Sequence, residues 1–307
     1  MSDSAKKLFV LTGPTAVGKT ELALQWAEQN NAEILSCDSL LFYRGMDIGT
    51  AKPTAAERAR VPHHLLDIAE VDERVDVALY LQQARSAIAA IQSAGKQILV
   101  VGGSGFYLRS FFAPIVDEVD VPAELRAEIG RKLETLGLEN LVDELNRLNP
   151  GGIGKLDTQN PRRVVRALER CEASGLTLTE LAQRFAAQPA PFSGWDIDIV
   201  CLEREKPVLE TRIQQRVEAM LSSGLVEETQ LLLTRGLRQN ASASRAIGYR
   251  ETIAMLDGEL SQAELMGAIV SNTRALVKKQ RTWFRTQLPS HRVVPANTAT
   301  ASELFRP

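Results

Sequence analysis

The chain has 307 residues, 44% of them hydrophobic and 24% charged, so there is enough apolar material for a folded core of one or two domains. No apolar run approaches the ~18 residues of a membrane span, and the polar N-terminus lacks the layout of a secretory signal. The three cysteines, Cys37, Cys171 and Cys201, are far apart and odd in number. They fit neither a disulfide framework nor a metal knuckle, and we expect a reducing, cytoplasmic setting.

The formal net charge of −2 argues against a nucleic-acid partner only as an average over the chain. Six basic residues and no acidic residue lie between Ser271 and Arg292, whereas acidic residues predominate between Asp117 and Glu144. Charge therefore has to be judged separately on each face of the molecule.

Strands and helices alternate in the first part of the chain. Short apolar runs predict three strands, at 8–11, 33–37 and 97–101. Helical spacing begins at Thr20 and recurs over 80–91. This alternation indicates βαβ units and a parallel sheet with both faces covered. A further strand at 196–202, followed by a helix, indicates that the same core resumes late in the chain.

The middle of the chain has a different pattern, in which apolar spacing predicts only helices. These helices are expected over 125–136, over 138–148 and over 162–173. We therefore expect an α/β core formed by residues 1–113 and 193–307, with an all-helical insertion at 114–192.

The strongest motif is GPTAVGKT at Gly13–Thr20, a full match to the phosphate loop G-x-x-x-x-G-K-[ST] between a strand and a helix. Glycines let several backbone N–H groups point at one anion, and the helix N-terminus adds partial positive charge. Lys19 supplies a mobile charge, and the Thr20 hydroxyl can hold Mg²⁺. The motif predicts a di- or triphosphate ligand.

A single aspartate, Asp38, ends the second predicted strand. It lies at the carboxyl edge of the sheet, where ligands of open α/β folds collect, so it should share a crevice with the phosphate loop. Asp38 could bind Mg²⁺ through water, orient a nucleophile or accept its proton. An ordinary loop or helix-capping aspartate is an equally good interpretation from position alone.

The phosphate loop and Asp38, together with several further segments, make the chain resemble the bacterial tRNA dimethylallyltransferases. The most specific block is YRGMDIGTAKP, from Tyr43 to Pro53. Further matching segments follow in the family's order, at 62–68, 102–105, 160–163, 166–169, 248–250 and 280–285. The chain departs from the family's usual pattern at Val17, which replaces serine, and at Ser104, which replaces threonine.

The motifs and the resemblance together imply a P-loop NTPase-like parallel sheet sandwiched by helices, with a helical insertion that contacts tRNA. The resemblance implies transfer of a dimethylallyl group from dimethylallyl diphosphate to N6 of the adenine 3′-adjacent to the anticodon, with release of diphosphate. Mg²⁺ would be the cofactor. No heptad seam indicates a dimer, so a monomer is expected.

The resemblance also assigns catalytic roles to Asp38, Lys19, Thr20 and Arg216. Asp38 would remove the proton from N6, and the other three, with Mg²⁺ on Thr20, would stabilise charge on the departing diphosphate. The diphosphate-binding residues would be Gly13, Pro14, Thr15, Ala16, Val17, Gly18, Lys19 and Thr20. Without the resemblance, Arg216 and Arg212, one helical turn before it, would be interpreted as solvated helix charges.

The N6 amine lies on the pairing edge of adenine, so the base has to leave its stack to react. The resemblance also implies a set of residues that face the tRNA. They are Asp38, Ser39, Leu40, Leu41, Ser104, Arg126, Arg162, Arg163, Val164, Val165, Arg166, Arg245, Ala246, Ile247, Gly248, Tyr249 and Arg250. Helical periodicity independently predicts two basic stripes, one of Arg162, Arg163, Arg166 and Arg170 and one of Arg274, Lys278, Arg281 and Arg285. Either stripe alone could be a solvated face, but the two together favour a phosphate backbone.

Several other features receive structural interpretations. His63 and His64 are expected to be buried or to anchor a loop. Met46 and Trp26 are expected to pack in the core, and the small, polar tail after Pro295 is expected to be disordered. Three other functions compete with the prenyl transfer: a small-molecule kinase, a prenyltransferase acting on free adenylate, and a non-catalytic RNA-binding module. A plain hydrolase is disfavoured, because no acidic residue follows the strand at 97–101.

Overall fold

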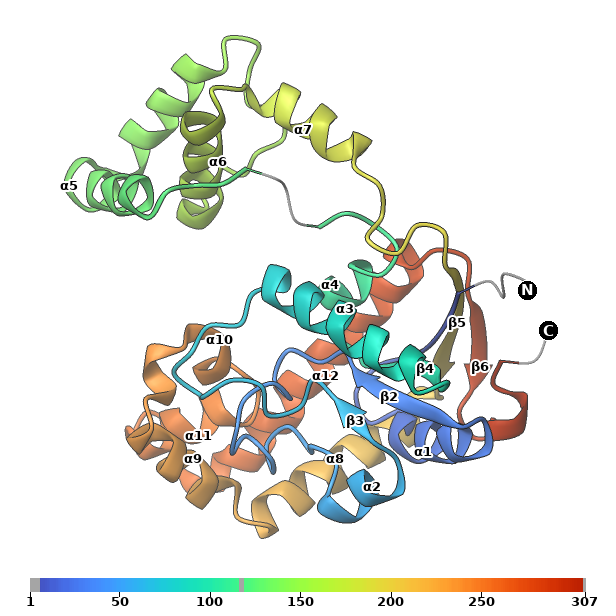
Figure 1. Ribbon diagram of the computed structural model, residues 1–307. Helices are drawn as coiled ribbons and strands as arrows, with labels where there is room; N and C mark the ends of the chain where they lie inside the picture. The colour runs from blue at the N-terminus through green and yellow to red at the C-terminus, as the bar shows by residue number, and fades with distance from the viewer. Residues whose placement is uncertain (1–5, 116–118, 306–307) are drawn as a thin grey trace. The chain divides into compact units, whose positions relative to one another are not determined.

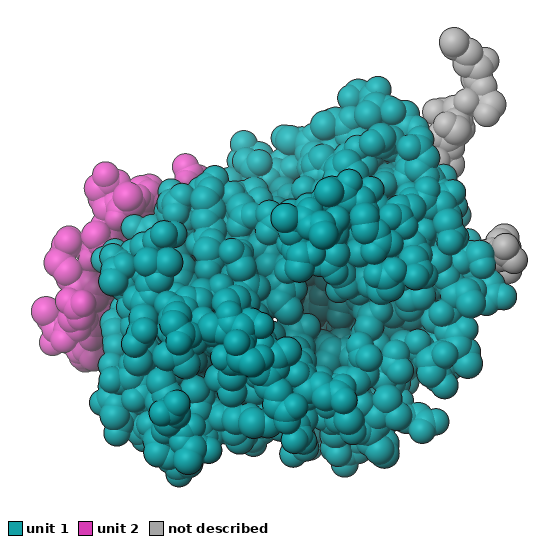
Figure 2. Space-filling view, turned by 90° about the horizontal axis from the view of Figure 1, so that it is seen from below, with its two compact units in different colours: residues 1–112, 192–307 teal, residues 113–191 magenta. Residues whose placement is uncertain are grey.

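The computed structural model describes residues 6–115 and 119–305, which divide into two compact units (Figure 1). Unit 1 comprises residues 1–112 and 192–307, and unit 2 comprises residues 113–191. Figure 2 colours the two units separately, and the face of unit 1 seen there is hollowed. The acidic segment that begins at Asp117 lies partly outside the described residues.

Unit 1 is built on a six-stranded sheet with the order β3-β2-β4-β1-β5-β6, and every strand pair is parallel. The strands are β1 (Lys7–Thr12), β2 (Ala32–Ser36), β3 (His63–His64), β4 (Gln97–Val101), β5 (Asp196–Glu203) and β6 (Arg292–Pro295). The four predicted strands are confirmed as β1, β2, β4 and β5. The two edge strands were not predicted, because they are too short to produce a distinct apolar run.

The helices of unit 1 are α1 (Lys19–Gln29), α2 (Ala55–Arg60), α3 (Val77–Ser93), α4 (Gly105–Arg109), α8 (Lys206–Ser222), α9 (Leu225–Thr234), α10 (Ala241–Ser244), α11 (Tyr249–Leu256) and α12 (Gln262–Gln287), with 3₁₀ turns η1 (Leu237–Gln239) and η2 (Ala301–Glu303). The chain crosses the sheet in opposite directions through α1 and through α3. Because such crossovers are right-handed, α1 and α3 cover opposite faces (Figure 1). The predicted α/β fold class is therefore confirmed.

The hydrophobic core beside α1 includes the end of the described chain. Trp26 is buried there, as predicted, and Ala301 and Leu304 are 3% and 1% exposed in the same cluster. The ring of Phe305 lies 5.0 Å from that of Phe9 and 5.1 Å from that of Trp26 between centroids. The prediction of a disordered tail is wrong for this segment, because its few apolar side chains complete a tertiary cluster that local composition does not reveal.

Unit 2 is entirely helical in its described residues. It contains α5 (Ala123–Leu148), α6 (Pro161–Ser174) and α7 (Leu178–Ala187). Gly137 breaks α5 with φ 81° and ψ 171°, so the two predicted helices are two helical segments joined at this glycine. Ile129, Leu145 and Leu168 are among the buried side chains that form the core of this unit.

Candidate active site

The phosphate loop connects β1 to α1 and passes close to β5. Gly13 has φ +141°, and a Cβ atom there would lie 2.6 Å from the carbonyl oxygen of Leu202, so no larger residue fits. Gly18 has φ +109° and precedes the first turn of α1, which brings the loop amides to the N-terminus of that helix. Lys19 Nζ donates to the carbonyl oxygens of Gly13 and Pro14 at 2.8 and 3.0 Å.

Asp38 follows β2 at the same edge of the sheet as the phosphate loop. Its Oδ1 atom accepts a hydrogen bond from the Leu40 backbone N–H at 3.1 Å, which is the local turn contact that an ordinary loop aspartate makes. Asp38 also lines two cavities, one together with Lys19 and Arg216 and the other with Arg216 but not Lys19. The structural and the functional interpretation of Asp38 are therefore compatible, since the turn holds the carboxylate in the cavity.

Burial shifts the pKa values of the three charged groups that meet here. Desolvation raises the pKa of Asp38, although the Leu40 N–H and the charges of Lys19 and Arg216 oppose the shift. Desolvation lowers the pKa of Lys19 to about 8, helped by Arg216 and opposed by Asp38. Burial also lowers the pKa of Arg216, against the attraction of Asp38. The site therefore holds an up-shifted carboxyl beside a down-shifted ammonium, a pattern typical of functional groups.

These shifts predict a pH dependence with two limbs in kcat/KM for a diphosphate substrate, which reports the free protein. On the alkaline side, activity should fall as pH rises through about 8, because Lys19 loses its charge there. On the acidic side it should fall as Asp38 is protonated, at a pH above the ordinary carboxyl range. Lys19→Arg should abolish the alkaline limb, since arginine stays charged. Persistence of that limb in the variant would assign it to another group.

Three arginines donate hydrogen bonds to backbone carbonyl groups, two of them in the phosphate loop and one at Thr50. Arg212 Nε donates to the carbonyl oxygen of Ala16 at 2.8 Å, and Arg204 Nε donates to that of Val17 at 3.1 Å. Arg216 donates to the carbonyl oxygen of Thr50 at 3.0 Å. Arg212 therefore contacts the loop directly and is not only a solvated helix charge. The role of Arg204 was not predicted, because nothing but its place after β5 marks it in the sequence.

Gln280 of α12 connects the phosphate loop to the glycine turn after β4. Its Oε1 accepts from the Thr15 backbone N–H at 2.9 Å, and its Nε2 donates to the Gly103 carbonyl oxygen at 3.0 Å. Gln280 lies in the motif at 280–285, but sequence reasoning gave it no role. Only the fold brings α12 next to a loop that lies 265 residues away.

Two cavities of about 550 Å³ each meet at the charged groups. The first is lined by the phosphate loop and by apolar side chains that include Ile34, Leu41 and Leu66. The second is lined by Ser39, Leu40, Ser104, Phe106, Arg245, Ala246, Ile247 and Trp283, among others. Both cavities are lined by Thr15, Asp38, Thr50, Gly103, Arg216 and Gln280. Asp38 and Arg216 therefore lie in the wall that the two cavities share.

The structure places the predicted tRNA-facing residues of unit 1 in different settings. Most line the second cavity, but Leu41 lines the first, and Arg250 is exposed and donates to Glu251. Tyr249 is 0% exposed, and its hydroxyl donates to Glu228 at 2.6 Å. The Tyr249 side chain is thus closed off from any tRNA, and only its backbone could fulfil the prediction.

The predicted residues of unit 2 also divide by exposure. Arg126, Arg162, Arg163 and Arg166 are exposed, whereas Val164 is fully buried in the unit's own core and Val165 is half-buried. Two of the arginines form ion pairs, Arg163 with Asp157 at 3.7 Å and Arg166 with Glu169 at 3.4 Å. The Val164 side chain therefore cannot contact tRNA, because it packs inward between the helices.

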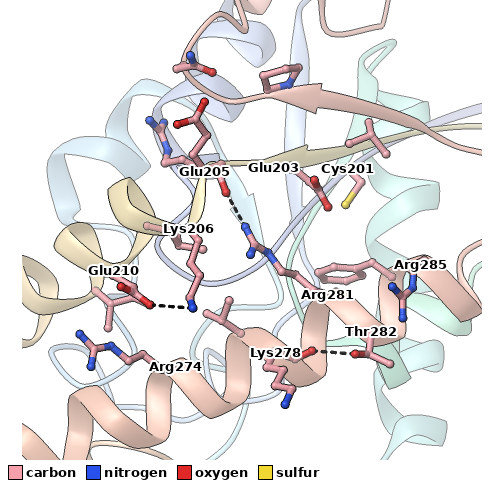
Figure 3. Close-up of a pocket in the computed structure, with 18 of the residues that line it drawn as sticks. Cys201, Glu203, Glu205, Lys206, Glu210, Arg274, Lys278, Arg281, Thr282 and Arg285 are labelled. Carbon is pink, nitrogen blue, oxygen red and sulfur yellow. Dashed lines mark hydrogen bonds and ion pairs between the residues drawn. The ribbon is translucent and has the colours of Figure 1, made fainter.

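The basic stripe of α12 lines a third cavity of about 1360 Å³, between α12, α8 and the last two strands (Figure 3). Arg274, Lys278, Arg281 and Arg285 line it, and Arg281 donates to the backbone carbonyl of Arg204. Lys279, Gln280 and Trp283 instead line the second cavity. The stripe therefore faces away from Asp38, on the opposite side of the same helix.

The sequence model described as IPP transferase matches residues 41–287 of this chain. The chain belongs to the IPP transferase family. A tRNA dimethylallyltransferase of Opitutus terrae is 59% identical over 295 residues, which cover 96% of this chain and 95% of the relative. The phosphate loop lies before the matched range, so the candidate site also contains residues outside that range.

Solved structures agree with this membership of the IPP transferase family. The full-length tRNA isopentenylpyrophosphate transferase of Bacillus halodurans has a TM-score of 0.71 at 32% identity, covering 97% of this chain and 93% of the other. A eukaryotic dimethylallyltransferase acting on tRNA has a TM-score of 0.81 at 25% identity, covering 95% of this chain and 74% of the other. The helices of the described residues do not include one with the length and apolar character needed to cross a membrane.

Proposed function

We propose that the chain transfers a dimethylallyl group from dimethylallyl diphosphate to N6 of the adenine 3′-adjacent to the anticodon in tRNA. The observation that carries the proposal is the meeting of two cavities at Asp38 and Arg216, because a transfer reaction needs donor and acceptor to reach one point. One cavity ends on the phosphate loop, which suits a diphosphate. Thr15 is the one phosphate-loop residue that lines the other cavity, so that cavity is available for the acceptor.

In the proposed reaction, the bond between C1 of the dimethylallyl group and the diphosphate oxygen breaks, and its electron pair leaves with the diphosphate. Lys19, Arg216 and the loop amides stabilise the charge that develops on the leaving group. The N6 lone pair forms the new bond to C1, and Asp38 accepts the N6 proton and later releases it to water. Ile34, Leu41 and Leu66 provide apolar surface for the isoprenoid chain.

The residues of the loop also fit a magnesium ion. Among the described residues, no cluster of three or more His, Cys, Asp or Glu side chains could hold a metal on its own. Mg²⁺ at diphosphate sites is usually bound by one or two protein oxygens and by the substrate's phosphates, which matches the Thr20 hydroxyl beside a phosphate loop. When bound, Mg²⁺ would neutralise charge on the diphosphate. We assign Thr20 as its protein ligand.

The acceptor side of the proposal is supported by exposed basic residues. Arg245 lines the second cavity, and Arg126, Arg162 and Arg163 are exposed on unit 2. A single-stranded anticodon loop suits the second cavity, because its bases can be splayed out at low energetic cost. A monomer acting on tRNA in the cytoplasm remains the expectation.

Arg162→Gln should weaken tRNA binding and reduce the slope of log Kd against log salt by about 1, because one phosphate contact and its released counterion are lost. The measurement is a tRNA titration at four or more salt concentrations. Arg131→Gln is the matched control, since Arg131 is another exposed arginine of the same unit. Equal slopes for wild type and Arg162→Gln would exclude an electrostatic contact at this position.

The deciding experiment follows radiolabelled dimethylallyl diphosphate with Mg²⁺ and either unmodified tRNA or free adenylate. Label should enter tRNA and not adenylate, without any requirement for ATP. Entry into adenylate would instead identify a small-molecule prenyltransferase. Phosphate transfer from ATP to a metabolite would identify a kinase, and binding of tRNA without any transfer would identify a non-catalytic module.

A further inference from the structure

Glu228 of α9 is bonded to the loop that follows Tyr43, although it lines neither of the two meeting cavities. Its Oε2 accepts from the backbone N–H groups of Asp47 and Ile48 at 3.0 and 2.7 Å, and its Oε1 accepts from that of Gly49 at 3.1 Å. One carboxylate thus binds three consecutive amides, which is a strong, charge-assisted arrangement. It fixes the backbone of the segment 47–49.

The Tyr249 side chain completes this arrangement. Its hydroxyl donates to Glu228 Oε1 at 2.6 Å, so that oxygen receives two hydrogen bonds. A Cβ atom on Gly49 would lie 2.5 Å from the Tyr249 ring, so glycine is required for the loop to pack this closely. The buried tyrosine therefore orients the carboxylate and supports the loop.

A buried lysine holds the far end of the same loop. The Lys52 side chain is 0% exposed, and its Nζ donates to the Tyr43 carbonyl oxygen at 2.7 Å. Lys52 Nζ also contacts Asp67 at 2.6 Å and Asp47 at 2.8 Å. The loop is thus fixed by charged groups on both sides of Thr50, which lies between Gly49 and Lys52.

Thr50 is the point where this held loop contacts the site. Its carbonyl oxygen accepts a hydrogen bond from Arg216 at 3.0 Å, and Thr50 and Arg216 line both meeting cavities. An arginine side chain has several rotamers, and a hydrogen bond from its guanidinium group to a fixed carbonyl oxygen selects among them. The direction of the Arg216 side chain therefore depends on where the loop holds Thr50.

We propose that Glu228 is a positioning residue for the transfer, which acts by fixing the Asp47–Thr50 turn so that the Thr50 carbonyl directs Arg216 toward the diphosphate. The expected effect on the transfer rate rests on the proposed function. The expected effect on diphosphate binding does not, because the geometry of Arg216 affects that binding by itself. Glu228 never touches substrate in this arrangement. In this proposal its effect on the reaction passes through Arg216.

The test is a double-mutant cycle of Glu228→Gln and Arg216→Ala, measured by single-turnover transfer to tRNA. Glu228→Gln should slow transfer about 10- to 100-fold in the wild-type background, because a misplacement of ~1 Å can cost that much. In the Arg216→Ala background the same substitution should change the rate less than about twofold. Glu227→Gln, an exposed neighbour on α9, is the matched control and should leave both rates unchanged.

A second measurement uses inorganic diphosphate with Mg²⁺ in a calorimetric titration. Glu228→Gln should weaken binding several-fold in the wild-type background and not in Arg216→Ala. This titration remains decisive if wild-type protein binds diphosphate but transfers nothing to tRNA, which would count against the proposed function only. Tyr249→Phe, which removes a single hydroxyl, should give a smaller loss that is likewise absent without Arg216.

Equal losses from Glu228→Gln in both backgrounds would overturn the proposal, because the residue would then act on the fold in general. A wild-type rate and wild-type diphosphate affinity in Glu228→Gln would overturn it too. Thermal unfolding of each variant identifies a general loss of structure, which would lower the melting temperature and the tRNA affinity together.

Discussion

Replacing Asp38 with alanine is expected to slow single-turnover transfer about 10²–10⁴-fold while tRNA affinity changes little. The physical reason is that the N6 lone pair is delocalised into the purine ring, so bond formation needs removal of the N6 proton at the same time. Asp38 lies where the two cavities meet, and desolvation raises its pKa toward the range useful for a general base. Rapid-quench measurement with enzyme in excess over tRNA isolates this step.

Asp38→Asn gives a sharper form of the same experiment. Asparagine keeps the size of the side chain and can keep the hydrogen bond from the Leu40 N–H, so the turn should survive. Only the ability to accept a proton is lost. Asp72→Asn, at an exposed aspartate of the same unit, is the control for loss of one negative charge. If Asp38→Asn reacts at the wild-type rate, Asp38 is only a loop residue.

The second large effect is expected for Lys19→Met, which should lower kcat/KM for dimethylallyl diphosphate about 10²–10³-fold. Removal of one preorganised donor to a developing anion typically costs this much. Methionine preserves the length of the side chain and removes its charge. The binding of tRNA alone should be unaffected, because Lys19 lines only the cavity on the phosphate-loop side. Saturation kinetics at fixed tRNA measure the loss.

A useful comparison for this substitution is Lys96→Met. Lys96 also forms an ion pair, at 2.6 Å with Glu33, but it lines none of the three cavities described above. Equal effects of the two lysine substitutions would mean that general electrostatics, and not a contact at the diphosphate, explains the result.

The parts of the fold that sequence predicted are those with a strong local pattern. The strands β1, β2, β4 and β5 have clear apolar runs, and the phosphate loop has a fixed glycine spacing. The short strands β3 and β6 lack such patterns. The helix α7 was missed although Thr177 and Glu180 form a capping box at its start. The contacts of Ala301 and Leu304 with the core beside α1 are long-range, and no local property of the tail indicates them.

The site was predictable to a similar, limited extent. Asp38 could be placed beside the phosphate loop because both lie at the carboxyl edge of a parallel sheet. Glu228 and Gln280 could not be found this way, since each acts on backbone groups far away in sequence, and backbone amides have no signature. The resemblance placed Val164 and Tyr249 toward tRNA although both side chains are buried, because a resemblance assigns segments and not the direction of each side chain.

The packing of η2 on α1 has a consequence for synthesis of the protein. The helix that follows the phosphate loop is made early, but Ala301 and Leu304, which shield Trp26 from water, are made 275 and 278 residues after Trp26. Contacts so distant in sequence form slowly, because a large loop has to close first. A nascent chain that already contains the whole anion-binding loop therefore still exposes the Trp26 side of the following helix to water until the tail has been made.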